Sequence, residues 1–433
     1  MRQFDELRDG ALDDWHPPVM ARVWQACLAL GAHGTAPLFA LQTLLFFGGL
    51  ALVFNALPRV RPAVVAAAVL ALVIPAGWLT VVVKDAQMVA ALVAATGLVA
   101  SFVLRGQRLP RWGVAAVAVL LTYAVLLRAN AAFAVVPLVL AWAGWFGARH
   151  VAARGALLLA ATLAVLGISP LVNHRLLGAA PSHVERTLPL FDLAGIAHFG
   201  GPPPPRVPAA AWARAEALHC YSPVQWDALG DDRRCGFVGN AVGLQGANGS
   251  GVIGEWARVI AAAPLAYARH RLAHLDATLR FVVPFGQPAA AAPPDSQPNA
   301  ERFGGGGTWR TRGPAWIGRA LAATPLGWPA AWLAASLGLW ATAADTPRSA
   351  ERALALALFV SATCATLSFA VVGIASDLRY HLWAMVATTL GGVLLSTVPG
   401  VPRQRLAATL AAVAIVAAIG TGARMILPAG VWQ

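Results

Sequence analysis

The chain has 433 residues, of which 58% are hydrophobic and only 12% are charged, and its mean hydropathy is +0.64. A soluble domain carries roughly 25% charged residues, so this composition excludes a soluble globular protein and predicts an all-α polytopic membrane protein. The net charge of +13 comes from arginines in short connectors between apolar runs, with no basic arm or stripe. Membrane topology accounts for much of that excess, and no nucleic-acid partner is predicted.

The N-terminal segment is polar and holds the stretch DDWHPP at 13–18. The two prolines keep His16 out of the helical region, so a rigid, extended turn is expected to lead into the apolar run 20–30. That run is too short to span a bilayer and is predicted to lie along its outer surface. Two interpretations of Asp13 and Asp14 stay open: a preorganised site, or a plain helix start with acids near its dipole.

Apolar windows of about 20 residues predict ten membrane-spanning helices in two blocks, separated by a Pro- and Gly-rich polar region. The expected spans are 35–57, 63–83, 86–104, 113–128, 131–147, 155–176, 324–343, 352–374, 382–399 and 406–427. The predicted domains are an outer-surface loop with an interfacial helix (1–34), a first transmembrane block (35–176), a periplasmic insert (177–315) and a second transmembrane block (316–433).

Within the insert, Cys220 and Cys235 are expected to form a disulfide, because disulfides persist in an oxidising outer compartment; free thiols are the alternative. The stretch FDLAGIAHF at 191–199 predicts a short surface helix. Asp192 and His198 on this helix are weaker candidates for a site.

The run 255–281 predicts a pair of interfacial helices that Pro264 separates. His270 and His274 are four residues apart and share one face of the second helix. Two histidines at this spacing could bind a metal, but no third ligand is evident. A basic face against lipid headgroups is therefore the preferred interpretation.

The arginine content of the connectors predicts the orientation of the chain. One alternating set carries at least two arginines in every connector and is expected to face the cytoplasm: 58–62, 105–111, 147–154, 345–352 and 402–405. The other set is expected to face the periplasm: the N-terminus, the Lys84–Asp85 turn, the Arg128 region, the 177–315 insert, the Asp377–Tyr380 turn and the C-terminus.

Four outer turns carry ionisable groups at helix ends: DDWHPP (13–18), VKDAQ (83–87), LRANA (127–131) and SDLRYHLW (376–383). Lys84, in the second turn, is the only lysine of the chain. Each charge could merely anchor its helix end by snorkelling. Charges at a membrane are costly, however, and usually point into a protein cavity. Four such turns on one side favour a shared site.

These turns and the large outer insert resemble the GT-C membrane glycosyltransferases. The resemblance is greatest to bacterial relatives of the protein-mannosyl and aminoarabinose transferases, which use polyprenyl-phosphate-linked sugars. It spans most of the chain through short motifs: an acidic first outer loop, HPP, KD, R-x-N and a late RY turn. It implies a GT-C-like fold in the bacterial inner membrane, with the active site facing the periplasm.

The resemblance further implies an enzyme, a hexosyl- or pentosyltransferase that acts on a glycan, lipid or protein acceptor. Asp14 or Asp13 would activate the acceptor hydroxyl, and His16 would line the site. The cations of the later turns would bind the lipid phosphate: Lys84, Arg128 and Arg379. Neighbouring polar groups would orient the sugar or its partners: Asp85, Asn130 and Tyr380.

The family places a transmembrane helix before the first outer loop, with its acid about ten or more residues ahead of HPP. No apolar span precedes DDWHPP here, so we expect that helix and that acid upstream of Met1. No cofactor is predicted with certainty, and a divalent cation stays open. Walker, Rossmann, HExxH and CxxC patterns do not occur, so nucleotide, zinc-protease and thiol-redox chemistry have no support.

Two other classes of function stay open. A polysaccharide polymerase or ligase of the O-antigen type would also have many helices, outer arginines and one large outer loop, but it would couple two lipid-linked glycans. A transporter is the non-enzyme alternative. Transporters usually place charges or broken helices near the bilayer midplane. Here the charges gather at helix ends, which argues against transport.

Overall fold

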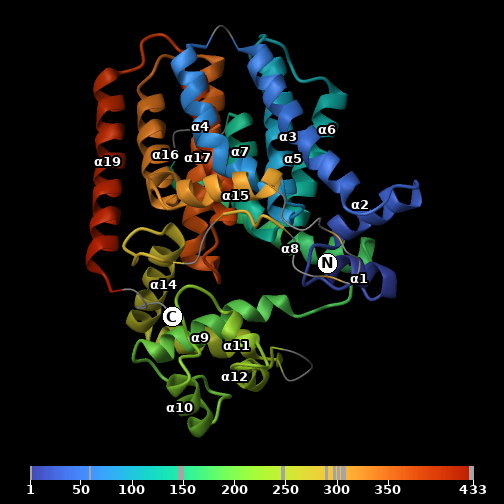
Figure 1. Cartoon of the computed structure of the whole chain (residues 1–433), viewed down its shortest axis with the longest axis vertical. Coiled ribbons are helices and arrows are strands. Elements are labelled where there is room, and N and C mark those ends of the chain that lie inside the picture. Colours follow the sequence, from blue (N-terminus) through green and yellow to red (C-terminus); the bar gives the residue numbers. More distant parts are fainter. Residues whose placement is uncertain are drawn as a thin grey trace.

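The computed structural model describes residues 2–57, 60–144, 151–244, 249–287, 291–295, 299, 303 and 309–428. Within these residues the regular structure is helical, with only two isolated β-bridges, as the composition predicts. The helices of the two apolar blocks form one bundle, and the helices of the insert gather at one end of it (Figure 1).

In the described part of the chain, ten helices form the bundle. The first block contributes α3 (Ala36–Ala56), α4 (Pro62–Trp78), α5 (Lys84–Val103), α6 (Arg111–Leu127), α7 (Ala132–Trp142) and α8 (Val151–Leu171), which continues into a π-helical turn, η3 (Val172–Leu176). The second block contributes α16 (Pro329–Ala344), α17 (Ala350–Val372), α18 (Leu382–Ser396) and α19 (Arg403–Ile426).

Among the described residues, five helices are long and apolar enough to cross a membrane: 36–56, 84–103, 152–176, 350–372 and 403–426. Three further apolar helices are shorter, at 62–78, 111–127 and 129–142. The chain thus has the character of a helical membrane protein, and the count of ten spans stays a prediction. The predicted span 63–83 is too long, because α4 ends at Trp78.

Helix α5 lies at the centre of the bundle. It is apolar on all sides, and 83% of its apolar window is buried, against 11% for the windows of 152–176 and α19. It crosses α3 at two glycines, Gly49 and Gly97, where a Cβ on Gly97 would lie 2.3 Å from the Gly49 carbonyl oxygen. Small residues permit this close approach of two backbones.

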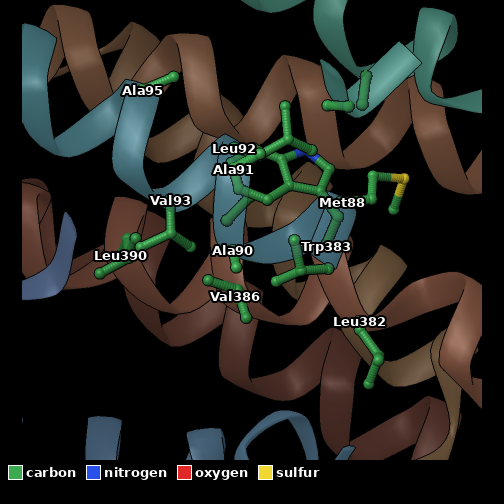
Figure 2. Packing of buried hydrophobic residues seen from close by; sticks show 14 of the residues in the cluster. Met88, Ala90, Ala91, Leu92, Val93, Ala95, Leu382, Trp383, Val386 and Leu390 are labelled. Carbon is green, nitrogen blue, oxygen red and sulfur yellow. The ribbon is translucent and has the colours of Figure 1, made fainter. Parts of the chain in front are cut away.

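The first half of α5 packs against α18. Figure 2 shows Met88, Leu92 and Val93 of α5 beside Trp383 and Leu390 of α18. Two buried hydrogen bonds extend this contact, since the Trp383 Nε1–H donates to Ser361 Oγ at 2.9 Å and that hydroxyl donates to the Ala134 carbonyl at 2.7 Å. Because these bonds join α18 and α7 through α17, they hold the starts of α7 and α18 in a defined arrangement.

The insert is built around α9 (Thr187–His198), whose side chains are nearly all buried. The prediction of a surface helix at 191–199 is therefore wrong; the apolar residues that suggested it form the core of the insert instead. The surrounding helices are α10 (Ala209–Ala217), α11 (Asp227–Gly230), α12 (Gly236–Val242), α13 (Val252–Ala262) and α14 (Pro264–Leu279). The predicted Cys220–Cys235 disulfide is present, and it connects the segment after α10 to the residue that precedes α12.

The helix pair α13–α14 is broken at Pro264 as expected, but its predicted basic face is wrong. His270 and His274 are both 0% exposed and face the protein interior rather than lipid headgroups. A further helix, α15 (Trp309–Ala322), crosses the boundary predicted between the insert and the second block, which falls inside it at 315/316.

Two short helices precede the bundle. Helix α1 (Arg2–Asp9) leads into the DDWHPP turn, and α2 (Pro18–Ala29) begins directly after it. Pro18 occupies the first helical position, where its missing N–H costs nothing. Helix α2 buries Met20, Ala21 and Trp24, so it packs on the protein along one side.

Candidate functional site

A short turn before α5 positions the KD pair. Gln42, buried in α3, donates through Nε2 to the carbonyls of Leu79 and Val81 at 2.7 and 3.1 Å. These bonds hold the turn that follows α4 in place. Lys84 and Asp85 then form the first turn of α5, where the helix dipole favours an acid. The Asp85 carboxylate is only 1% exposed.

Arg128 reaches Asp85 from the next outer turn. Helix α6 ends at Leu127, and Arg128 is extended before the 3-10 turn η1 (Ala129–Ala131) that leads into α7. Its Nε lies 2.9 Å from Asp85 Oδ1, and its guanidinium stacks 4.2 Å from the centroid of the Tyr380 ring. The salt bridge and the cation–π contact together fix the direction of this arginine.

Arg379 reaches the same carboxylate from the turn η7 (Leu378–His381), which precedes α18. Its Nε lies 3.6 Å from Asp85 Oδ2 and 3.0 Å from Asp377 Oδ2. Asp377 also caps the turn, accepting the Arg379 backbone N–H at 3.0 Å. Burial raises the pKa of Asp377, while the Arg379 charge acts in the opposite direction.

We call Lys84, Asp85, Arg128, Asp377, Arg379 and Tyr380 the Asp85 cluster. It sets three cations against two carboxylates. Lys84 interacts electrostatically with Arg128, Asp85 and Arg379, yet it forms no ion pair with a described residue. The cluster therefore retains positive charge that an anionic group such as a phosphate could neutralise.

The insert contacts this cluster through one extended segment. The Trp226 N–H donates to the Ile374 carbonyl at 3.0 Å, and the Ser376 N–H donates to the Val224 carbonyl at 2.7 Å. This short ladder joins the insert to the turn that carries Arg379. It also brings Asp227 close enough for an electrostatic interaction with Arg379.

Asp227 was missed by reasoning from the sequence. It lies in a polar insert and belongs to no recognisable motif, so no local signal distinguishes it from the insert's other acids. Partial shielding by the protein raises the pKa of its carboxyl group, and Arg379 acts in the opposite direction. Only the pairing of two distant segments shows that it lies beside a cation.

Asp14 and Asp13, the predicted bases, lie in the first outer loop and contact residues outside the Asp85 cluster. Asp14 Oδ1 accepts from the Ser182 backbone N–H at 2.7 Å and from its hydroxyl at 2.6 Å, and Asp14 Oδ2 lies 3.3 Å from His174 Nε2. Asp13 Oδ1 caps the turn by accepting the Trp15 N–H at 2.9 Å. Asp14 thus ties the DDWHPP loop to residues 174–182, while Asp13 caps the turn within the loop, and His16 lies in the same turn.

The structure brings together Lys84, Arg128 and Arg379 as predicted, but no hydrogen bond or ion pair of the described chain joins Asp14 to them. The link between the two places is aromatic: the Trp15 and Trp226 rings lie 5.8 Å apart. Asn130 follows Arg128 by two residues and is partly exposed in η1.

The insert holds a second buried carboxylate. Asp192 Oδ1 lies 2.9 Å from His270 Nε2 and also pairs with Arg271, while Asp192 Oδ2 accepts the Trp256 Nε1–H at 2.8 Å. The other ring nitrogen of His270 bonds the Tyr221 hydroxyl at 2.7 Å. We call these five residues the Asp192 network. Its carboxylate and its imidazole are matched by buried partners, which is typical of a structural network.

No metal-binding group emerges from the described ranges. No set of three or more His, Cys, Asp and Glu side chains there could hold a metal ion. His274, the second histidine of α14, uses Nδ1 to donate to the Pro223 carbonyl at 2.7 Å. The His198 ring packs against the Tyr221 ring in a tilted arrangement, with the ring centroids 4.7 Å apart, instead of joining the Asp85 cluster.

Comparisons of the chain with protein-family models, with curated proteins and with solved structures find no match.

Proposed function

We propose that the chain is a GT-C-type membrane glycosyltransferase, which moves a sugar from a polyprenyl-phosphate-linked donor to a glycan, lipid or protein acceptor. The observation that supports this most is the convergence of Lys84, Arg128 and Arg379 around the buried Asp85. Three separate helix ends supply these cations, at the end of the bundle that bears the insert (Figure 1).

The chemistry of sugar transfer suits such a cluster. The donor is a phosphodiester, and when its sugar–oxygen bond breaks the lipid keeps a phosphate monoester with one more negative charge. Fixed cations near that phosphate stabilise the developing charge without reorganising. Arg128 and Arg379 can offer paired N–H groups, and Lys84 adds a compact point charge. Asp85 would hold the two arginines in position.

The place of the cluster also fits a lipid-linked donor. The lipid tail of such a donor keeps its phosphate at the membrane boundary, and the cluster lies at the ends of apolar helices rather than at their middles. In the proposed topology this boundary is the periplasmic face of the bacterial inner membrane, and about ten helices span it. The arginine-rich connectors would face the cytoplasm.

Cysteine labelling in intact cells tests that topology. A cysteine introduced at Ala210, which is exposed in the insert, should react with a membrane-impermeant maleimide. A cysteine at Arg108, exposed at the other end of the bundle, should react only after lysis. The reverse pattern would overturn the orientation and with it the proposed function.

Lipid-phosphate binding tests the site itself. Full-length protein in nanodiscs is titrated with undecaprenyl phosphate. Lys84→Ala and Arg379→Ala should each weaken binding by roughly 30-fold or more, because losing one partner of a buried charge contact costs about 2–5 kcal/mol. Lys84→Arg should restore only part of the affinity, since the two cations are not interchangeable at a shaped site.

The matched control is Arg405→Ala. Arg405 pairs with Asp345 at 2.7 Å across two connectors of the predicted cytoplasmic set, so its loss should leave undecaprenyl phosphate binding unchanged. Equal affinities for the wild type, Arg379→Ala and Arg405→Ala would show that these arginines only anchor helix ends.

A further inference from the structure

We propose that Asp227, on the insert, is the general base that takes the proton of the acceptor hydroxyl. This inference rests on the proposed transferase function and assigns the role expected of Asp14 or Asp13 to a different residue. It follows from how the insert holds Asp227, from its electrostatic interaction with Arg379 and from what occupies the other acids nearby.

The insert holds Asp227 in a defined position. The preceding residue, Trp226, is bonded through its N–H to the Ile374 carbonyl, and Gly230 leaves the space that the Trp226 ring occupies. A Cβ at Gly230 would lie 2.5 Å from that ring. The first turn of α11, which begins at Asp227, is therefore fixed to the outer turn between α17 and α18.

Side chains of α14 hold the same junction between the insert and the turn that precedes α18. Arg271 Nη1 donates to the Gly373 carbonyl at 2.6 Å, and the Thr278 and Ser376 hydroxyls lie 3.0 Å apart. His274 donates to the Pro223 carbonyl on the other side of the ladder. Backbone and side-chain bonds thus hold the segment that carries Asp227 against the segment that carries Arg379, as a preorganised site requires.

The other carboxylates at this place are already occupied. Asp85 is sealed between Arg128 and Arg379, and Asp377 pairs with the Arg379 side chain and caps its own turn. Asp14 is held by Ser182 and His174. Asp227, by contrast, is exposed, and its carboxylate makes no hydrogen bond or ion pair with the described part of the chain.

Asp227 also lies near the cations that are proposed to bind the donor phosphate. It interacts with Arg379, which belongs to the cluster proposed to bind the donor phosphate. Its neighbour Trp226 contacts Trp15 of the first outer loop, which provides an apolar aromatic surface next to the carboxylate. An acceptor hydroxyl between the donor sugar and this surface would come within reach of the base.

The proposed reaction transfers the sugar to the acceptor oxygen and one proton to Asp227. The acceptor oxygen forms a bond to the anomeric carbon of the sugar, and its proton passes to the Asp227 carboxylate. The bond between the anomeric carbon and the phosphate oxygen breaks, and its electron pair leaves on that oxygen. The released polyprenyl phosphate is held by the cations of the Asp85 cluster, and Asp227 later returns its proton to water.

The test uses full-length protein in nanodiscs and donors with a labelled sugar: undecaprenyl-phosphate-linked mannose, glucose and aminoarabinose. The rate at which label leaves the lipid is followed with inner-membrane extract as the acceptor source. Asp227→Asn should lower this rate by roughly 10²–10⁴-fold, the usual contribution of a general base. Its affinity for undecaprenyl phosphate should stay at the wild-type value or rise, since a negative charge near Arg379 is removed.

Two further variants sharpen the result. Asp227→Glu should keep part of the rate, because the carboxylate remains. Asp231→Asn, four residues along the same loop, removes a carboxylate that only caps the Arg233 N–H at 2.9 Å and should leave the rate unchanged. The wild-type rate should rise with pH as the base loses its proton, and this rise should be absent from Asp227→Asn.

A wild-type rate in Asp227→Asn would overturn the inference while leaving the proposed function intact. Equal losses of rate and of undecaprenyl phosphate binding would also overturn it, because Asp227 would then be a structural partner of Arg379. If the wild type neither binds undecaprenyl phosphate nor uses any of the donors, the proposed function fails and the inference fails with it.

Discussion

Asp85 and Asp192 are both buried carboxylates that contact cations, but their surroundings differ. Asp192 contacts His270, Arg271 and Trp256, which all belong to the insert, and the acid, the histidine and the arginine are at most 6% exposed. At Asp85 the acid is equally buried, yet the side chain of Arg128 is 15% exposed and that of Arg379 33% exposed.

The two networks differ in the exposure of their cations and not in the burial of their acids. Burial of the acid alone does not identify a binding site, because both carboxylates are sealed. The charges of the Asp192 network pair with one another in the protein interior, whereas Arg128 and Arg379 of the Asp85 cluster keep a side open to solvent. A buried acid that orients open cations is typical of a site for an anion.

The largest effect that would sharpen this comparison is on stability. Asp192→Asn leaves Arg271 and His270 buried without their acid and should cost about 3–5 kcal/mol of unfolding free energy. Asp85→Asn should cost clearly less, because both arginines can still reach solvent. Denaturant titration with proteolysis of the insert as readout measures both. A greater loss for Asp85→Asn than for Asp192→Asn would reverse the assignment of structural and functional roles.

Removal of the disulfide should lower the stability of the insert and leave the Asp85 cluster unaffected. Cys220 and Cys235 close a loop with a sequence separation of 15, and replacing both by serine should cost roughly 3 kcal/mol in the chain-entropy model. The loss should appear in unfolding of the insert and leave undecaprenyl phosphate binding nearly unchanged. Cys27→Ser, at a free cysteine of α2, is the control. Loss of binding in the double mutant at low denaturant would show that the site depends on this loop directly.

Acid should weaken the insert through His274. Burial lowers the pKa of this histidine to about 3, below its ordinary value of 6.5. The unfolded chain therefore takes up the proton first, and stability falls as the pH drops below 6.5. At pH 5 the loss from one such histidine is about 2 kcal/mol. His274→Asn, which keeps a donor for the Pro223 carbonyl, should reduce this pH dependence. An unchanged pH profile in the variant would refute the assignment.

The smallest expected effect concerns the ring that supports Arg128. Tyr380→Leu removes the cation–π contact and should weaken undecaprenyl phosphate binding by about 1 kcal/mol, within the usual range for such contacts. Tyr380→Phe keeps the ring face and should bind almost as well as the wild type. If the phenylalanine variant loses as much as the leucine variant, the hydroxyl rather than the ring face matters.

Much of the fold was predictable because its signals are local. Long apolar runs indicate helices wherever they occur, so the cores of α3, α5, α17 and α19 fall within the predicted spans. The position of Cys220 and Cys235 in an insert expected to face an oxidising compartment favoured their disulfide over free thiols. The cations Lys84, Arg128 and Arg379 were recognisable because charges are rare in such a chain and each stands at a helix end.

Tertiary structure decided what these residues touch. No local pattern shows that Gln42 of α3 binds the turn after α4, or that the apolar helix around Asp192 is a buried core rather than a surface element. The sequence by itself determined which residues are charged and where helices begin. The partner of each charge depends on segments far apart in the chain, as when residues 224–226 pair with 374–376 and set Asp227 beside Arg379, because hydrogen bonds and Coulomb forces act over a few ångströms of space and not along the sequence.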